Sequence, residues 1–333
     1  MVKRVRLICL ILFGLGILLT SLPHAAQSFY AALHPGSGSL LTASLTETAQ
    51  SQVEANPTPT PANTTPATIQ YQTYLTSQSF VHVVRVPTEQ FLVTPAVTEG
   101  LEQLEQFAQT AGAIAGVNGG FFDPVNQQTT SYIVVQGEQV ADPTQNDRLM
   151  TNPDLTASLD RILNRSEFRQ YECGEAIQYS ITAHLDPVPS GCQLVSSLGA
   201  GPRLLPELAL SEEAFAEIVN GEFVRDALGS QQPNARTAIG ITDTEEILLV
   251  MAAQLQNAPT HSGMSLPELA SFMEILGATS AMNLDGGSSS ALYYRGQDNQ
   301  GQDNQGQTYY GRVDAEGNRI ERPVKSVLLV HAR

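Results

Sequence analysis

Two asparagines, each close to a pair of glycines, stand in the segments best suited to chemistry. Asn118 directly precedes one glycine pair, whereas Asn283 lies two residues before Asp285 and the second pair. Paired glycines accept positive φ values and let backbone amides approach a bound anion. On an extended segment Asn283 and Asp285 share one face. A carboxylate beside amide donors can transfer a proton or stabilise positive charge on a sugar carbon, and the alternative is that Asp285 is only a turn cap.

Two arginines are candidates for binding an anion beside that carboxylate. Arg236 begins a predicted hairpin strand, and Arg203 follows a Gly-Pro pair. A guanidinium presents paired donors that match phosphate oxygens, and its charge is permanent. Surface or structural ion pairs are the alternative in a chain this acidic. His184 and His261 are single histidines in predicted loops, and we leave both out of the candidate site.

Alternating helix and strand patterns place these residues at strand ends. A helix is predicted over 101–111, and a short buried strand follows over 113–117. A second helix begins with a capping box of Ser265 and Glu268, and a strand over 278–284 follows it. The other predicted elements are strands over 80–86 and 326–331, a hairpin over 237–252, and a helix from Ser211 to about Gly221.

The order of these elements predicts an α+β fold with mixed β-sheets flanked by helices in a single domain, residues 69–333. Two segments also align without gaps at an offset of 165 residues. Each has a helix, a glycine stop, a short apolar strand and then an asparagine, Asn118 or Asn283. Our hypothesis is an internal pseudo-repeat that brings these two asparagines close together at strand ends.

Residues 1–28 have the pattern of an export signal. Basic residues precede an apolar stretch, and small residues follow it. The stretch is short for a membrane span, which favours a signal peptide over a signal anchor, although membrane attachment through residues 5–22 stays open. Residues 29–68 are rich in Pro, Thr and Ser and predict a disordered linker. We expect an exported protein that is periplasmic, extracellular or anchored to the outer face of the inner membrane.

Charge and cysteine usage narrow the possible partners. The formal net charge is −16, and basic runs are missing after the first six residues. Such a chain repels phosphate backbones, so we expect no nucleic-acid partner. Cys173 and Cys192 lie in loop-like contexts of the predicted exported part and predict a disulfide. A metal pair is the weaker alternative, because only His184 lies between them.

Three ordered blocks resemble the hallmark motifs of the phosphodiester glycosidase family. They are Val-Asn-Gly-Gly-Phe-Phe-Asp at 117–123, Asn-Ala-Arg-Thr-Ala-Ile-Gly at 234–240 and Asn-Leu-Asp-Gly-Gly-Ser-Ser at 283–289. Shorter similarities at 201–203 and 322–324 extend the resemblance over most of residues 110–331. The chain departs from the pattern at Ser288, near which a third glycine is frequent, and this puts the local turn shape in doubt.

The resemblance implies hydrolysis of a glycosidic bond whose anomeric oxygen carries a phosphodiester, within envelope or exopolysaccharide glycans. Asp285 would then act as nucleophile, as base for water or as an oxocarbenium stabiliser, and Arg236 or Arg203 would hold the phosphate. The implied partner is a phosphorylated carbohydrate, and no cofactor or metal is expected. The candidate catalytic residues are Asp285, Arg236, Asn118 and Asn283, and the candidate substrate-binding residues are Gly119, Gly120, Asp123, Arg203, Thr237, Gly286, Gly287 and Ser288.

Two other functions use the same residues. A non-catalytic envelope protein could bind glycans in the same polar site, but such a site needs neither a phosphate-binding arginine nor a carboxylate. A metal-dependent phosphodiesterase could ligate calcium through Asp123 and Asp285. The motifs of zinc hydrolases and serine esterases do not occur in the sequence.

Overall fold

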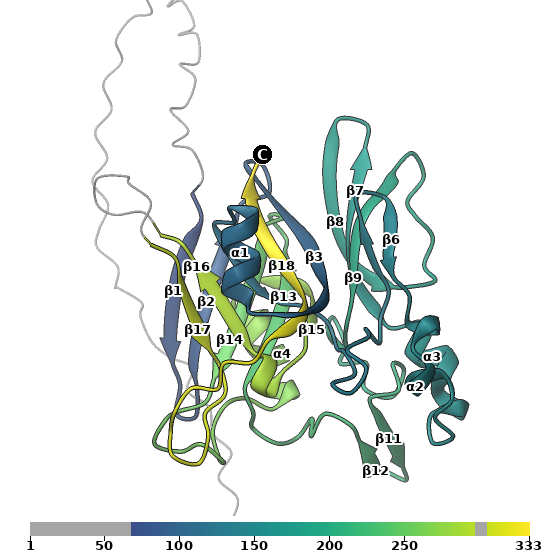
Figure 1. Cartoon of the computed structure of the whole chain (residues 1–333), viewed down its shortest axis with the longest axis vertical. Coiled ribbons are helices and arrows are strands. Elements are labelled where there is room, and N and C mark those ends of the chain that lie inside the picture. Colours follow the sequence, from purple (N-terminus) through teal and green to yellow (C-terminus); the bar gives the residue numbers. More distant parts are fainter. Residues whose placement is uncertain (1–67, 297–304) are drawn as a thin grey trace, which may run out of the picture. The chain divides into compact units, whose positions relative to one another are not determined.

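Two antiparallel β-sheets pack face to face in the computed structural model, which describes residues 68–296 and 305–333 (Figure 1). The six-stranded sheet has the order β1 (Gln70–Leu75), β2 (Phe80–Val86), β14 (Ile247–Ala253), β13 (Arg236–Thr242), β15 (Ala278–Asn283) and β10 (Arg203–Leu205). The five-stranded sheet has the order β17 (Gln307–Tyr310), β16 (Ala291–Tyr294), β4 (Ala115–Asn118), β18 (Val324–Ala332) and β3 (Phe91–Glu102).

The central strands are apolar on both faces because each face is covered. Ile239 and Leu249 point into the core between the two sheets, together with Leu328 of the facing sheet. Their neighbours Ala238 and Leu248 point the other way, into a second cluster. A strand buried on both faces requires a continuous apolar run rather than an alternating pattern, and the sequence of β14 has one.

A helix covers the outer face of each sheet (Figure 1). α1 (Leu104–Ala111) packs Leu104 and Phe107 against the five-stranded sheet. α4 (Leu266–Ile275) packs Leu269 and Met273 against the six-stranded sheet, and the predicted capping box at its start is confirmed. The first helix begins later than predicted, because residues 101 and 102 complete β3. Each helix is packed on its sheet, and the strand that follows it, β4 or β15, starts from that fixed helix.

The two helices make equivalent connections. β3 and β4 are parallel to each other, since both pair antiparallel with β18, which lies between them. β14 and β15 flank β13 in the same way. Each helix thus carries the chain across one antiparallel strand and into the strand that ends in an asparagine. The pseudo-repeat stays a prediction that this shared connection supports.

A third antiparallel sheet lies beside the first two (Figure 1). Its order is β6 (Glu138–Ala141), β5 (Ile133–Val135), β9 (Gln193–Gly199), β7 (Ser166–Cys173) and β8 (Ala176–Ala183). Phe168 and Leu198 join the main core. The predicted disulfide is confirmed, because Cys173 and Cys192 are bonded and join the end of β7 to the start of β9. The short helical segments are η1 (Pro143–Gln145), α2 (Asp147–Met150), η2 (Thr156–Ser158), α3 (Leu159–Leu163) and η3 (Gly287–Ser289).

The helix predicted from Ser211 to Gly221 is wrong. The chain there forms a hairpin of β11 (Ala216–Val219) and β12 (Glu222–Asp226). Asn220 and Gly221 form its turn with φ values of 53° and 86°. An Asn-Gly pair with positive φ is the preferred two-residue hairpin turn, and this preference outweighs the acidic residues that suggested a helix start.

The expected mixed sheets are also corrected. All strand pairs among the described residues are antiparallel. The two strands that each helix connects are parallel to each other, but an antiparallel strand lies between them, so they do not pair. The predicted signal (1–28) and most of the predicted linker (29–68) lie outside the described residues, and the domain bounds stay a prediction. Within the described ranges, the helices are too short or too polar to cross a bilayer.

Candidate active site

The turn that contains Asp285 lies where the ends of both facing sheets meet. The Asp285 amide donates to the carbonyl of Gly119 at 3.0 Å. On the other side, the amides of Leu284 and Gly287 donate to the carbonyls of Thr237 and Ala235 at 2.8 and 2.7 Å. The two double-glycine segments predicted to converge, 118–120 and 283–287, are therefore hydrogen-bonded to each other.

The glycines of the two turns are required for different reasons. A Cβ on Gly119 would lie 2.4 Å from Ser326 Oγ, and one on Gly120 would lie 2.3 Å from the carbonyl oxygen of Gly199. Gly119 and Gly120 do not have the positive φ that we expected, so close approach of neighbouring chains excludes a side chain there. Gly287 has a φ of 61°, and only this position needs the left-handed conformation.

Asn118 is completely buried and connects both sheets. Its Nδ2 donates to the carbonyl of Asp285 at 2.7 Å. Its Oδ1 accepts from Thr237 Oγ1 at 2.8 Å and from the Ala291 amide at 3.0 Å. These bonds use the polar atoms of the Asn118 side chain to hold the Asp285 turn in place. Direct contact of Asn118 or Thr237 with substrate stays a prediction.

The Asp285 carboxyl has the most unusual ionisation in the site. Burial raises its pKa to about 6, although the Ser289 hydroxyl, Arg322 and the Gly286 amide act in the opposite direction. The side chain keeps partial access to solvent. A carboxyl with a pKa close to the working pH can exchange protons or change charge during a reaction.

Several oxygens near this turn have no hydrogen-bond partner among the described residues. Asn283 Nδ2 donates to the carbonyl of Gly201 at 3.0 Å, but Asn283 Oδ1 accepts no hydrogen bond from the described residues. The same holds for Ser290 Oγ, and for Ser326 Oγ beside Gly119. Buried polar atoms are normally satisfied, so these oxygens are places where the protein can hold water in its interior. They are buried, so none of them faces the surface from which a substrate would enter.

Arg236 is buried and bonded to the backbone. Its guanidinium donates to the carbonyls of Met264 (3.0 Å), Leu228 (3.2 Å), Gly229 (2.8 Å) and Gln232 (3.1 Å). Burial lowers its pKa to about 10, with Asp226 acting against this shift. The observed bonds hold two loops together and leave little donor capacity for phosphate. Its predicted role in binding phosphate is not what the geometry favours.

Arg203 and Asp123 make their hydrogen bonds with residues outside the Asp285 turn. Arg203 Nε donates to the carbonyl of Glu207 at 3.5 Å. Asp123 Oδ1 accepts from the Val125 amide at 2.7 Å, and its Oδ2 pairs with Arg148 Nε at 2.7 Å. Burial works to raise the pKa of Asp123, but these donors outweigh it and lower the pKa. These contacts cap the turn after Asp123, and binding of substrate by Asp123 stays a prediction.

Sequence reasoning missed two arginines beside the turn. Arg322 Nη1 donates to Ser288 Oγ at 3.0 Å, and its guanidinium lies over the Phe122 ring at 4.9 Å. A Cβ on Gly287 would lie 3.4 Å from Arg312 Nη1. The Arg-Pro-Val similarity at 322–324 was a usable signal for Arg322. Arg312 follows a strand that pairs only through β16, and the local sequence contains no sign of that pairing.

A groove of about 320 Å³, named here the Arg312 groove, adjoins the turn. Its polar lining comprises Asn234, Gln254, Thr260, Arg312 and Asp314. His261 is exposed next to Thr260 in the chain, and the two side chains share a hydrogen bond of 2.7 Å.

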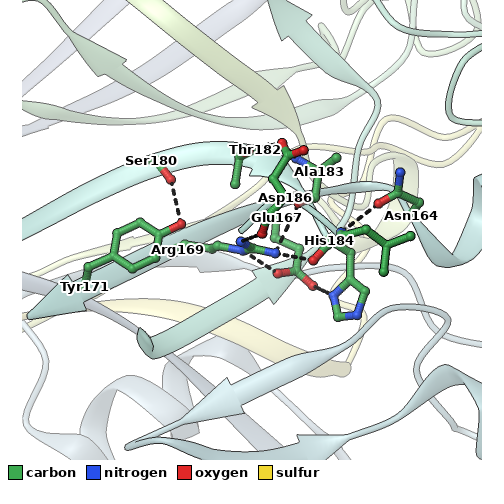
Figure 2. A network of polar contacts seen from close by, with 10 residues as sticks. Asn164, Glu167, Arg169, Tyr171, Ser180, Thr182, Ala183, His184 and Asp186 are labelled. Atoms are coloured by element: carbon green, nitrogen blue, oxygen red, sulfur yellow. Dashed lines mark hydrogen bonds and ion pairs between the residues drawn. The ribbon is translucent and has the colours of Figure 1, made fainter. Parts of the chain in front are cut away.

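His184 belongs to a different cluster on the third sheet (Figure 2). Its Nδ1 lies 2.5 Å from Glu167 Oε1, and Glu167 Oε2 pairs with Arg169 Nε at 2.9 Å. Arg169 also donates to the carbonyls of Ala183, His184 and Asp186. These residues face away from Phe168 and the main core. The contacts fasten the loop after β8 to β7.

The described residues contain no group of three or more His, Cys, Asp or Glu side chains that could hold a metal ion. Asp123, the partner of Asp285 in the calcium alternative, is bound to Arg148.

Comparison with known proteins identifies the family. Residues 111–331 match the phosphodiester glycosidase family. Among proteins of curated function, none matches the sequence.

Two solved structures share the fold. The catalytic domain of zebrafish N-acetylglucosamine-1-phosphodiester alpha-N-acetylglucosaminidase, auto-inhibited by its pro-peptide, has a TM-score of 0.55 at 19% identity, covering 80% of this chain and 83% of that chain. A Burkholderia pseudomallei protein assigned as exported has a TM-score of 0.50 at 20% identity, covering 76% and 74% of the two chains. Because the family match extends over more than half of the sequence, this chain belongs to the phosphodiester glycosidase family.

Proposed function

We propose that this protein hydrolyses the bond between the anomeric carbon of a sugar and the oxygen of a phosphodiester, with Asp285 acting at the anomeric carbon. The observation that carries the proposal is the Asp285 carboxyl itself. It is partly exposed, its pKa is raised to about 6, and it lies where the motif segments of both sheets are joined.

The reaction would transfer the sugar to water. Water supplies a hydroxyl to the anomeric carbon, the bond from that carbon to the phosphate oxygen breaks, and the bond electrons leave with a phosphomonoester. This leaving group is already an anion, so neutralising its charge is more important than protonating it. The groups that act on Asp285 are a guanidinium, a hydroxyl and a backbone amide, which suit this requirement.

Asp285 acts in its ionised form in this proposal. An ionised carboxylate can attack the anomeric carbon, take a proton from water, or stabilise an oxocarbenium-like centre. All three roles disappear when the carboxyl is protonated. The proton that Asp285 or solvent accepts from water balances the reaction.

The remaining motif residues position this carboxylate. Asn118 and Thr237 hold the turn through buried hydrogen bonds, and Arg236 fixes the loops beneath it. Arg322 reaches the turn through Ser288 and supplies positive charge near Asp285. Asn283 is buried and donates to the carbonyl of Gly201, which supports a positioning role for this predicted catalytic residue.

The substrate's setting is a separate part of the proposal. The predicted signal and linker, together with the disulfide, support action on envelope or exopolysaccharide glycans outside the cytoplasm. The name of the zebrafish relative makes an N-acetylglucosamine-1-phosphodiester the first substrate to test.

The decisive experiment is incubation of the full-length protein with that substrate, followed by chromatography of the products. We expect equal amounts of free sugar and phosphomonoester. Release that persists with a chelator argues against the metal-dependent alternative. No release across a panel of sugar-1-phosphodiesters, pH values and metals, together with saturable glycan binding, would favour the non-catalytic glycan-binding protein instead.

A further inference from the structure

The Arg312 groove contains two donors that the fold does not use. Asn234 Oδ1 accepts from the Ala235 amide at 2.9 Å, which leaves the Nδ2 of the same side chain free of acceptors within the described ranges. Arg312 is exposed, and its guanidinium likewise has no hydrogen bond or ion pair with any described residue. Both donors converge on Gly287, whose Cβ, if present, would lie 3.4 Å from Arg312 Nη1 and 3.9 Å from Asn234 Nδ2.

Other arginines nearby are bonded to the backbone. Arg236 donates to four carbonyls, as described above, and Arg319 Nη1 donates to the carbonyls of Gln254 and Gly311 at 3.0 Å each. These bonds give the two arginines a structural role. Arg312 has no such role in the described residues, although it is exposed in a chain of net charge −16 that is rich in carboxylates.

The groove is also within reach of the reacting carboxyl. Gly287 is two residues from Asp285, so their Cα atoms are at most about 7 Å apart. The absence of a side chain at Gly287 leaves open the space between Arg312 and the turn. Asp314 is the acidic residue of the groove, and its carboxylate accepts from the amides of Glu316 and Asn318 within its own turn. The anion-accepting end of the groove is therefore the Gly287 end.

We infer that the Arg312 groove is the phosphate subsite, in which the Arg312 guanidinium and Asn234 Nδ2 hold the non-bridging oxygens of the substrate phosphodiester beside Gly287. This inference rests on the proposed function for its substrate, and it proposes Arg312 in place of Arg236 as the phosphate ligand. It also orients the substrate, with the sugar on the Asp285 side and the group beyond the phosphate along the groove.

The test measures binding rather than turnover. Dimethyl phosphate, a phosphodiester without a sugar, is titrated into the full-length protein by calorimetry, with Asp285→Asn as the background so that no chemistry is possible. Arg312→Gln is expected to weaken binding about 10-fold or more, because a charge-assisted pair of hydrogen bonds is lost. Arg312→Lys keeps the charge without the fork and is expected to lose less.

A matched control removes the same charge elsewhere. Arg333 is exposed at the last residue of the chain, and Arg333→Gln is expected to leave binding unchanged. If Arg333→Gln weakens binding as much as Arg312→Gln, only the net charge is sensed and the subsite is overturned. Failure of the parent protein to bind dimethyl phosphate saturably, or equal binding by Arg312→Gln, also overturns it.

The outcome is separable from that of the proposed function. Phosphodiester binding that depends on Arg312, in a protein without glycosidase activity, would keep the subsite and remove the reaction. Glycosidase activity, together with phosphodiester binding that does not change in Arg312→Gln, would support the proposed reaction and contradict the proposed subsite. The proposal further expects Arg312→Gln to raise KM for the phosphodiester more than it lowers kcat, since Arg312 contacts the phosphate rather than the anomeric carbon.

Discussion

Asp285 and Glu167 are both acidic side chains in low-solvent surroundings, but Glu167 is buried and paired, whereas Asp285 is partly exposed and incompletely paired. Glu167 on the third sheet is buried, and each of its oxygens has a partner, Arg169 on one side and His184 on the other (Figure 2). Asp285 has a guanidinium and a hydroxyl near it, but burial dominates and raises its pKa. Complete pairing holds a fold together, whereas incomplete pairing leaves a carboxyl able to react.

The same contrast separates two arginines. Arg236 is in a family motif but gives its donors to carbonyls, and Arg312 is outside the motifs but is unbonded within the described part of the chain. In the proposed phosphate subsite, the arginine that contacts substrate lies outside the family motifs. The remaining capacity for hydrogen bonds is the better guide.

The strongest test of the contrast is Asp285→Asn. We expect turnover to fall by about 10³-fold or more, because an amide cannot attack, accept a proton or neutralise charge. Stability at pH 7 is expected to stay the same or rise, since an unfavourably buried charge is removed. Product release and urea unfolding measure the two quantities. Near-normal turnover would remove Asp285 from the mechanism.

Glu167→Gln should have the opposite effect. It leaves Arg169 buried without a charge partner, so we expect a loss of about 3 kcal/mol in the free energy of unfolding. At temperatures where the variant is folded, kcat/KM should remain within about 2-fold of the parent. Glu172→Gln, on an exposed residue of the same strand, is the matched control and should change neither quantity. A large loss of kcat/KM in folded Glu167→Gln would break the comparison.

Arg236→Lys tests the arginine contrast. A lysine cannot donate to four carbonyls in that geometry, so we expect a loss of about 2 kcal/mol in stability. Dimethyl phosphate affinity should stay unchanged, in contrast to Arg312→Gln. Arg161→Lys, at an exposed arginine, serves as the control for the substitution itself. Weakened phosphate binding at unchanged stability would return the phosphate-binding role to Arg236.

The smallest predicted effect is the shape of the pH profile. Because the reaction needs ionised Asp285, kcat/KM should fall about tenfold per pH unit below the pKa of about 6. An arm that falls above pH 6 instead would make Asp285 a general acid. The folded pKa lies above the ordinary value of 3.8 for an aspartate, so folding favours the protonated form. Stability should therefore decrease as pH rises from about 4 to 6, and Asp285→Asn should remove this decrease.

The sequence predicted the parts of the fold that depend on local patterns. The capping box at Ser265 and the hairpin over 237–252 are confirmed. The 211–221 segment was predicted wrongly, because acidic residues outweighed the Asn-Gly turn in our interpretation. The order of strands was not predicted, since it depends on pairings between residues far apart in sequence.

For the candidate site, too, the sequence predicted what depends on local motifs and missed what depends on distant pairings. The motifs located the Asp285 turn and its contact with the segment at 118–120. They did not show that Arg236 is bonded to backbone carbonyls. A motif arginine that binds the backbone and one that binds a ligand look the same in the sequence. Arg312 was missed because it is positioned by pairing of β17 with β16, which no local pattern contains.

The hydrogen bonds of Asn118 also bear on how the protein matures. This one amide joins residues that are 119, 167 and 173 positions away in the chain. These hydrogen bonds require the closure of long loops, so we expect them to be completed late in folding. A partly folded chain would therefore have no assembled Asp285 turn, and the appearance of enzymatic activity would report completion of folding.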